Sequence, residues 1–574
     1  MNFLAHRLNT RSNAERKFNI EPVCRRSPIR IGLKPFGAVV CLLAAFVFLQ
    51  SFLPLNTAIQ IGADEGFELA KATLCLNGYN LYTEVWNDQP PLHTFLITQI
   101  LKYLTPSIRG PRLLTLVFTA LLLTSVFFIS LRVGGLLVAA LTTALLITSP
   151  GFIELSASSM LEIPGLAPAV AALGVLLVGR QSKWHVSEIL SGVLFGVTLE
   201  IKLVNLILLP LAALIVWLRS REMEAPRRVR GRSVVGRFLT GYVIRRGLLL
   251  TGSLAISFVA IDYVIDRGAF LLHFQQPWSS HFASAKSFEY GSANEHPFDR
   301  SIFLKNWDTT IPALLGIVFL FPRNKKLQVK SSNRSPLTPT LSPSDGGRVS
   351  PSPERSIFGA ASREKGHFNV GNRTALMILP LAWLALTLVV FATHKPWWSY
   401  YYIHIAIPVC GCAAIGIAAV WQEVQRRRHV GLSSLFVVLA ICMLGWMGAR
   451  VYLQISGIRH SPQTYSSLVL GEIERLKPFA RFIYTDESIY SFHARIPLPP
   501  DLAVLSLKRF WSGDMTNARV AEEMGTIKPE VILLRNDTRA VPFQELLDAE
   551  YRVVYQDTDH RLYTKKALAK QAGY

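Results

Sequence analysis

Acidic residues lie near apolar stretches of this sequence. Asp64 and Glu65 lie beyond the first such stretch, Phe36–Leu53, and Glu162 stands at the start of a later one, where a charge is costly and is usually retained for a function. A carboxylate in such a place can act as the general base that takes a proton from a hydroxyl or an amine. If two loops converge, Asp64 and Glu162 flank one site, where they could orient an acceptor or share a divalent cation, Mg²⁺ or Mn²⁺.

The acidic pair also has a structural interpretation. Asp64 could cap the N-terminus of a helix, with Glu65 favourably placed in its first turn. The residues that follow favour a helix, because Phe67, Ala70 and Leu74 recur at helical spacing. We expect this helix to lie on the outer membrane surface. The spacing alone leaves the catalytic and the capping roles of Asp64 open.

Basic residues at other span ends offer the opposite charge. Lys202 lies between two short apolar stretches, and His394 and Lys395 precede a run of tryptophans and tyrosines that includes Tyr401. Such cations could clamp a phosphate and stabilise the negative charge that it gains as a leaving group. The alternative is that the lysines only extend from span ends to water, and that the aromatic run is an interfacial belt.

The composition places these residues in a membrane protein. Half of the 574 residues are apolar and 17% are charged, whereas a soluble protein carries about 25% charged residues. The apolar residues come in blocks, several of which are long enough to cross a hydrocarbon core. The sequence therefore predicts a polytopic α-helical membrane protein with about 11–13 spans.

The positive charge is distributed unevenly. The net charge of +22 is concentrated before Lys34 and in the segments 219–246, 323–373 and 422–429, which separate apolar blocks. This bias is typical of loops on the cytoplasmic side of a membrane. Because no aromatic residues alternate with the arginines, we expect no nucleic-acid partner.

The chain is predicted to have three parts: a basic cytoplasmic tail (1–35), a transmembrane domain (36–455) and a small extracytoplasmic α/β domain (457–574). Within the transmembrane domain we expect two outer loops, at 54–91 and 267–308. We also expect one disordered cytoplasmic linker at 331–366, because this segment is rich in Ser, Pro, Thr and Gly.

Two local patterns need the structure to interpret them. In the last part, helical stretches alternate with short β-branched and aromatic runs, such as Arg481–Thr485, Val504–Leu507 and Val531–Leu534. This alternation predicts a largely parallel sheet. Nearer the N-terminus, the segment Leu92–Leu104 disturbs the alternation of inner and outer loops. Either it does not cross the membrane fully, or the neighbouring spans begin and end elsewhere.

Motifs in the first outer loop resemble those of a known family. The acidic pair Asp64-Glu65 is followed by Gly-Tyr-Asn-Leu-Tyr at 78–82 and by Gln-Pro-Pro-Leu at 89–92. In this order they resemble the first loop of the C-type (GT-C) glycosyltransferases, most closely family 39, the protein O-mannosyltransferases, and the related lipid A aminoarabinose transferase.

Later segments extend the resemblance over about residues 36–455. Met160–Pro164 resembles the second acidic motif of the family, in which many members have Asp where this chain has Glu162. Leu199–Lys202 resembles the lysine between short helices, and Lys395–Pro408 the late Lys/Trp/Tyr segment.

The resemblance implies transfer of a sugar from a polyprenyl-phosphate donor, embedded in membrane lipid, to an acceptor outside the cytoplasm, with inversion at the anomeric carbon. The acceptor could be a protein, a lipid or a glycan. Asp64 would be the base, and the enzyme would be a multi-pass protein of the bacterial cytoplasmic membrane. The implied site comprises catalytic carboxylates (Asp64, Glu65, Glu162), donor-phosphate ligands (Lys202, His394, Lys395) and substrate-loop residues (Tyr82, Gln89, Tyr401).

Two other functions remain open on the sequence. A transporter or flippase for lipid-linked saccharides should carry charges in mid-span and an internal repeat, and neither is evident. An envelope oligosaccharide polymerase or ligase would usually have its large outer loop late in the chain, whereas here the acidic loop follows the first span.

Overall fold

The computed structural model of the chain describes residues 33–57, 64–104, 107–179, 185–224, 241–273, 296–320, 370–427, 429–461, 465–536 and 541–574. The basic tail before residue 33, the predicted linker at 331–366 and the middle of the predicted outer loop 267–308 lie outside the described residues.

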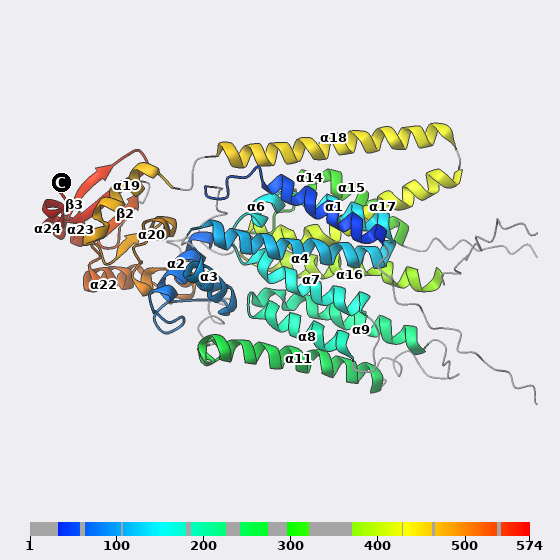
Figure 1. The fold of residues 1–574 in the computed structure, drawn as a ribbon, viewed down its shortest axis with the longest axis horizontal. Coiled ribbons are helices and arrows are strands. Elements are labelled where there is room, and N and C mark those ends of the chain that lie inside the picture. Colours follow the sequence, from blue (N-terminus) through cyan, green and yellow to red (C-terminus); the bar gives the residue numbers. More distant parts are fainter. Residues whose placement is uncertain are drawn as a thin grey trace, which may run out of the picture.

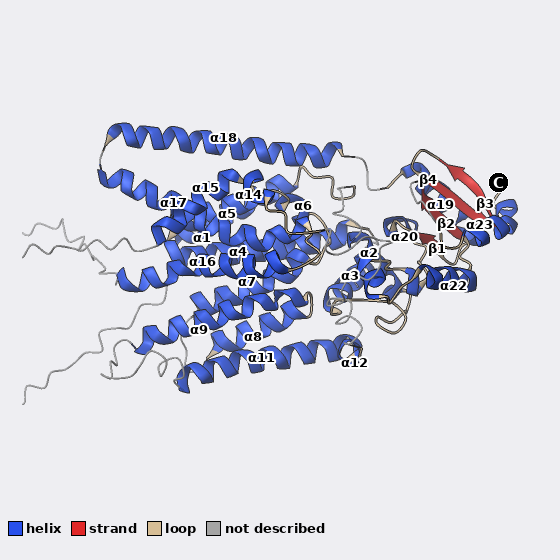
Figure 2. Ribbon diagram, turned by 180° about the vertical axis from the view of Figure 1, so that it is seen from behind, coloured by secondary structure: helices blue, strands red, loops and turns tan. Residues whose placement is uncertain are grey.

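Long apolar helices form a bundle (Figures 1 and 2). Among the described residues, seven helical stretches are long and apolar enough to cross a membrane, and four shorter apolar helices accompany them. The long ones are α1 (Leu33–Gln50), α4 (Arg109–Gly134), η1 with α9 (Leu203–Leu208 and Leu209–Glu224), α11 (Gly241–Asp266), α16 (Val370–Thr393), η4 with α17 (Ser399–Tyr401 and Tyr402–Arg427) and α18 (Val430–His460). The short ones are α5 (Leu136–Ile147), α7 (Glu162–Val178), α8 (Val186–Leu199) and α15 (Trp307–Leu320). The predicted polytopic helical class is confirmed.

The bundle packs around α17. Of the 18-residue apolar stretch of α17, 83% of the residues are buried, whereas no residue of the corresponding stretch of α18 is buried. α18 runs along the outside of the bundle (Figure 1). Small residues permit the closest helix contacts, as is usual in membranes. A Cβ on Gly316 of α15 would lie 2.0 Å from the carbonyl oxygen of Cys412, and one on Gly416 of α17 would lie 2.3 Å from that of Pro312.

Two helices cover one end of the bundle. α2 (Asp64–Leu76) packs against α3 (Leu92–Tyr103) and against α20 (Ser488–Ala494) of the C-terminal domain. Most residues of the first of these helices are buried between protein elements, so its apolar face packs against protein; its position at the outer membrane surface stays a prediction. α3 has 12 residues and is not among the apolar helices that could span, so the segment Leu92–Leu104 does not cross.

The C-terminal domain shares a hydrophobic core with these two helices. Leu69 of α2 and Ile97 of α3 belong to the same buried cluster as Ile473 and Ile483 of the C-terminal domain. All four side chains are fully buried. Burial of apolar surface across the boundary fixes the domain to the end of the bundle.

The sheet of this domain is mostly antiparallel. Its order is β1-β2-β4-β3, from Ile483–Thr485, Val531–Arg535, His560–Lys565 and Tyr551–Gln556. Only β1 and β2 run parallel; both pairings of β4 are antiparallel. The prediction of a largely parallel sheet is wrong, and so is the predicted strand at Val504–Leu507, which leads into a helix instead.

Short helices complete the description. In the bundle these are α6 (Phe152–Ser156), α12 (Ala269–Leu272) and α14 (Ser301–Lys305). Those of the C-terminal domain are α19 (Ser467–Leu476), η5 (Lys477–Phe479), η6 (Pro500–Leu502), α21 (Leu507–Ser512), α22 (Asn517–Ile527), α23 (Gln544–Glu550) and α24 (Lys566–Gln571).

Candidate active site

A cavity of about 1170 Å³ lies between the bundle and the C-terminal domain. Its wall combines residues from the starts of α2 and α7, the segment between α8 and α9, the segment 393–401 and residues 504–508 of the C-terminal domain. Four carboxylates and four lysines line it: Asp64, Glu68, Asp88, Glu162, Lys71, Lys202, Lys395 and Lys508. The cavity is therefore large enough for a substantial ligand and is densely charged.

Asp64 is held by a tyrosine from the far end of the sequence. It is the first residue of α2, where a negative charge is favoured by the helix dipole. The Tyr400 hydroxyl donates to Asp64 Oδ2 at 2.9 Å. Burial, and then the nearby charge of Glu162, raise the pKa of the Asp64 carboxyl above its ordinary value. A raised pKa makes a carboxylate a better proton acceptor near neutral pH.

Glu162 and Lys202 form an ion pair on the same wall. Lys202 Nζ donates to Glu162 Oε1, and both side chains are buried to nine-tenths or more. The second carboxylate oxygen of Glu162 is buried without a hydrogen-bond partner among the described residues. Gly165, one turn into α7, permits this contact, because a Cβ there would lie 2.9 Å from Lys202 Cβ and 2.8 Å from Asn205 Nδ2.

Glu65 points away from the cavity and organises its surroundings. Its two oxygens accept from Arg112 Nε at 2.9 Å and Nη2 at 2.7 Å, and Oε1 also accepts from the backbone N–H and the hydroxyl of Ser159. Both members of the pair are fully buried. Because Ser159 stands just before Glu162, this contact links the two segments that carry the cavity carboxylates. We assign Glu65 a positioning role in place of the predicted catalytic one.

The loop between α2 and α3, which was predicted to contact substrate, contains a polar network around Gln89. The backbone carbonyl of Gln89 accepts from the Tyr82 hydroxyl at 2.8 Å and from Asn87 Nδ2 at 2.7 Å. Gln89 lines the cavity, whereas Tyr82 does not and is buried beneath the loop.

Glu68 of α2, another carboxylate of the cavity, is ionised. Burial would raise the pKa of Glu68, but Lys71 at 2.6 Å and the neighbouring His93 lower it to about 2.

The segment after α16 contributes cations and rings. His394, Lys395 and Tyr401 all line the cavity. Lys202 Nζ lies 5.7 Å and 5.5 Å from the ring centres of Tyr400 and Tyr401, which is within the range of cation–π contacts. Burial, followed by the positive charges of Lys508 and Lys202, lowers the pKa of His394. This imidazole is therefore neutral at neutral pH and can offer one N–H but no positive charge.

The structure thus brings together most of the residues predicted for the site. Asp64, Glu162, Lys202, Gln89, His394, Lys395 and Tyr401 line one cavity, while Glu65 and Tyr82 support it from behind. Sequence reasoning missed Tyr400 and the two residues Asp88 and Lys508, which form an ion pair at 3.1 Å. Of these three residues, only Asp88 could have been predicted from the sequence, because it lies in the acidic outer loop 54–91, next to Gln89.

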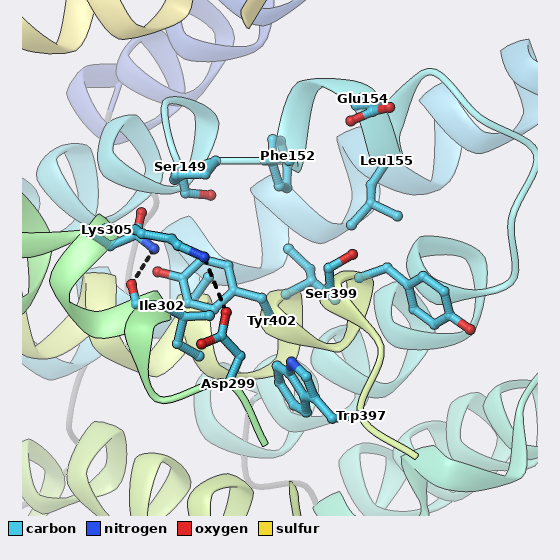
Figure 3. A pocket seen from close by; sticks show the side chains of 16 residues that line it. Ser149, Phe152, Glu154, Leu155, Asp299, Ile302, Lys305, Trp397, Ser399 and Tyr402 are labelled. Carbon is cyan, nitrogen blue, oxygen red and sulfur yellow. Dashed lines mark hydrogen bonds and ion pairs between the residues drawn. The ribbon is translucent and has the colours of Figure 1, made fainter. Parts of the chain in front are cut away.

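A second, smaller cavity of about 250 Å³ adjoins the first (Figure 3). Ser399 and Tyr400 line both cavities. Asp299 and Lys305, paired at 3.2 Å, lie on its wall with Trp397 and Glu154. Tyr400, the hydrogen-bond donor to Asp64, therefore stands between two openings.

The residues of the large cavity give little support for a bound metal. Asp64 and Glu162 were the predicted donors, but one oxygen of Glu162 is occupied by Lys202. Within the described part of the chain, no group of three or more His, Cys, Asp and Glu side chains could hold a metal ion. We therefore derive no step through Mg²⁺ or Mn²⁺, and the cation stays a prediction.

Comparisons with known proteins identify the architecture. The sequence matches no protein-family model and no curated protein. Among solved structures, ArnT from Cupriavidus metallidurans in the apo state aligns with a TM-score of 0.54 at 14% identity, over 93% of this chain and 99% of that one. The same protein bound to undecaprenyl phosphate aligns with a TM-score of 0.50 over the same shares.

A third structure has the same arrangement. The archaeal oligosaccharyltransferase AglB from Archaeoglobus fulgidus, in complex with an inhibitory peptide and a dolichol-phosphate, aligns with a TM-score of 0.51 at 10% identity, over 88% of this chain and 69% of that one. At such low identity these alignments establish a shared fold, and for ArnT they do so over nearly the whole of both chains.

Proposed function

We propose that this multi-pass membrane protein, which has the GT-C fold that its motifs predicted, is a glycosyltransferase that uses a polyprenyl-phosphate sugar. One observation carries the proposal. Of the four carboxylates that the structure describes on the cavity wall, three form ion pairs with lysines, whereas Asp64 accepts a hydrogen bond from the neutral Tyr400 hydroxyl. Asp64 is thus the carboxylate best suited to accept a proton.

The proposed step is a single displacement at the anomeric carbon. Asp64 takes the proton of an acceptor hydroxyl or amine, which attacks the sugar as the bond from the anomeric carbon to the phosphate oxygen breaks. The electron pair of that bond stays on the phosphate, whose growing charge Lys202 and Lys395 offset, while His394 can donate a hydrogen bond. Attack opposite to the leaving group inverts the anomeric configuration.

The ligands bound to the structural neighbours support a lipid donor. ArnT has been solved with undecaprenyl phosphate and AglB with a dolichol-phosphate. In this chain the cavity wall includes apolar residues of the bundle, such as Leu203, Leu206 and Phe258, beside the charged ones. An apolar chain with a phosphate head matches this mixed lining.

We place the cavity outside the cytoplasm of a bacterial cell, in its cytoplasmic membrane. The last turn of α17 carries Arg426 and Arg427, and this end of the helix lies opposite to the C-terminal domain (Figure 1). Basic helix ends favour the cytoplasmic side. The C-terminal domain and the cavity beneath it then face outward.

The pH dependence of transfer should report the raised pKa of Asp64. The base must be ionised, so kcat/KM rises with pH as Asp64 loses its proton, at a pH above the ordinary aspartate range. Glu162→Gln removes a negative charge near Asp64 and leaves the positive charge of Lys202 without its counter-ion. Both changes favour the ionised form of Asp64 and so lower its pKa. We expect the acid limb to move to lower pH in this variant. A limb that stays in place or moves upward would assign it to another group.

Lys202→Ala and Lys395→Ala should impair donor use more than acceptor use. Loss of one charge-assisted contact to phosphate costs about 1.5–3 kcal/mol, or roughly ten- to a hundredfold in donor kcat/KM. Lys102→Ala, an exposed lysine on α3, is the matched control and should behave as wild type. Wild-type donor kinetics in both cavity variants would support the alternative, in which these lysines only extend to water.

The proposal itself is tested with membranes that contain the protein and a labelled polyprenyl-phosphate sugar, supplied with an envelope extract as the source of acceptor. A transferase moves the label from the lipid to a second molecule. Label that crosses the bilayer and stays on the lipid would identify a flippase. Label that extends a lipid-linked glycan in repeating units would identify a polymerase.

A further inference from the structure

The C-terminal domain contributes a continuous part of the large cavity. Residues 504–508 line it, although they were predicted to include a strand of the domain's own sheet. The segment is fixed by its neighbour Arg509, which is fully buried and donates to the Asp501 and Val504 carbonyls and to the Asp501 and Asp514 carboxylates. The position of Lys508 is therefore set by a rigid local structure.

The same arginine also ties the segment to the bundle side of the cavity. Its guanidinium lies 5.2 Å from the ring centre of Trp86, which belongs to the loop between α2 and α3 and lines the cavity. Together with the shared hydrophobic core, this contact keeps residues 504–508 on the wall of the cavity that Asp64 and Lys202 also line. Lys508 in this segment therefore lines the ligand space.

Lys508 has a partner that it can exchange. Its Nζ lies 3.1 Å from Asp88 Oδ2, and the two side chains are 23% and 15% exposed. By contrast, Lys202 and Glu162 are 10% and 2% exposed. Because the pair between Lys508 and Asp88 is more solvated than the pair between Lys202 and Glu162, its exchange for a phosphate costs less. Burial would lower the pKa of Lys508, but its ion pair with Asp88 is the main contact that holds the pKa above the usual value, and the ammonium stays charged.

We propose that Lys508 is a donor-phosphate ligand supplied by the C-terminal domain, so that this domain is part of the active site. The inference rests on the proposed function. In the ground state of the donor the phosphodiester carries one negative charge; when the bond to the anomeric carbon breaks, the electron pair remains on phosphate, which gains a second charge, and the acceptor proton passes to Asp64. Lys508 remains protonated and, with Lys202 of the same cavity, offsets that additional charge.

The test measures binding of three probes to the full-length protein in nanodiscs: undecaprenyl phosphate, undecaprenol and inorganic phosphate. We expect the wild type to prefer undecaprenyl phosphate to undecaprenol, and Lys508→Ala to lose about ten- to a hundredfold of that preference. Lys508→Arg should keep most of it. Lys477→Ala, an exposed lysine of the same domain, should keep all of it.

A second variant separates a ligand contact from a structural tether. Asp88→Asn breaks the same ion pair but leaves the Lys508 ammonium available, so the preference for the phosphate head should be kept or increased. A loss in Asp88→Asn equal to that in Lys508→Ala would show that the pair only holds the domain in place, and would overturn the inference.

The remaining outcomes are distinct. If the wild type does not distinguish undecaprenyl phosphate from undecaprenol, the proposed function fails. If it does and Lys508→Ala distinguishes them equally well, only the role of Lys508 fails. Displacement of the lipid by micromolar inorganic phosphate would assign the cations to a soluble phosphate and contradict a donor site. We expect no displacement at that concentration.

Discussion

Asp64→Asn should reduce turnover on the order of a hundred- to ten-thousandfold, the usual contribution of a general base. Asparagine has the shape of aspartate, is accepted at helix N-termini about as well, and retains an oxygen for the Tyr400 hydroxyl, which now donates at 2.9 Å. The substitution therefore removes proton acceptance and little else. The measurement is sugar transfer by purified, monodisperse protein in nanodiscs.

The control for this substitution is Asp548→Asn, an exposed aspartate in the C-terminal domain, which should keep wild-type turnover. Unfolding temperatures of the three proteins should agree within a few degrees. If Asp64→Asn retained activity within a few-fold of wild type, Asp64 would be a structural residue of α2, and the base would have to be another carboxylate of the cavity.

Glu65→Gln should instead act on stability. The change leaves the Arg112 guanidinium buried without its counter-charge, and breaking a buried pair from one side costs about 3–5 kcal/mol. Both side chains are fully buried, and Glu65 also accepts two hydrogen bonds from Ser159. We expect a large fall in the free energy of unfolding and in the yield of folded protein, measured by denaturant and thermal unfolding in detergent.

The chain offers an exposed pair for comparison. Glu423 and Arg427 lie 2.9 Å apart on the surface of α17, and Glu423→Gln should cost less than about 1 kcal/mol. Replacing both members of the buried pair, Glu65→Leu with Arg112→Leu, should recover part of the stability lost in Glu65→Gln, because no unpaired charge remains. A Glu65→Gln protein with wild-type stability but lost turnover would restore the predicted catalytic role of Glu65.

Hydrophobic periodicity and charge in the sequence predicted the helices of this fold well, but they predicted the contacts between those helices less well. Apolar blocks of the right length predicted the long apolar helices. The charged residues near those blocks predicted Asp64, Glu162 and Lys202 as site residues, and the structure places all three on one cavity. The partner of Asp64 could not be found in this way, because Tyr400 lies 336 residues away and its aromatic neighbourhood resembles an ordinary interfacial belt.

The C-terminal domain illustrates two different errors. The antiparallel pairing of β3 and β4 could have been predicted from the sequence, since only residues 557–559 separate the two strands and a connection that short cannot join parallel strands. The structure of the segment 504–507 could not have been predicted in this way. Val504 is apolar because it packs in the core shared with α2, and a short apolar run has the same composition in a strand and in a buried loop.

The burial of the helix after Asp64 could not be predicted, for a similar physical reason. Its buried face carries Glu68 and Lys71, which sequence rules assign to solvent. The two side chains neutralise each other, and Asn87 and His93 complete their hydrogen bonds. Such compensation depends on residues of the next helix and loop and leaves no periodic trace in the sequence.

The central claim, that a sugar leaves a polyprenyl phosphate by a single displacement assisted by Asp64, is tested most directly by the reaction products. Purified protein is incubated with a polyprenyl-phosphate sugar of known anomeric configuration and an envelope acceptor fraction; released polyprenyl phosphate is quantified, and the product anomer is assigned by NMR. The account predicts one polyprenyl phosphate released for each sugar transferred, inverted configuration, and loss of both products with Asp64→Asn. Retained configuration, or transfer that does not depend on Asp64, would contradict it.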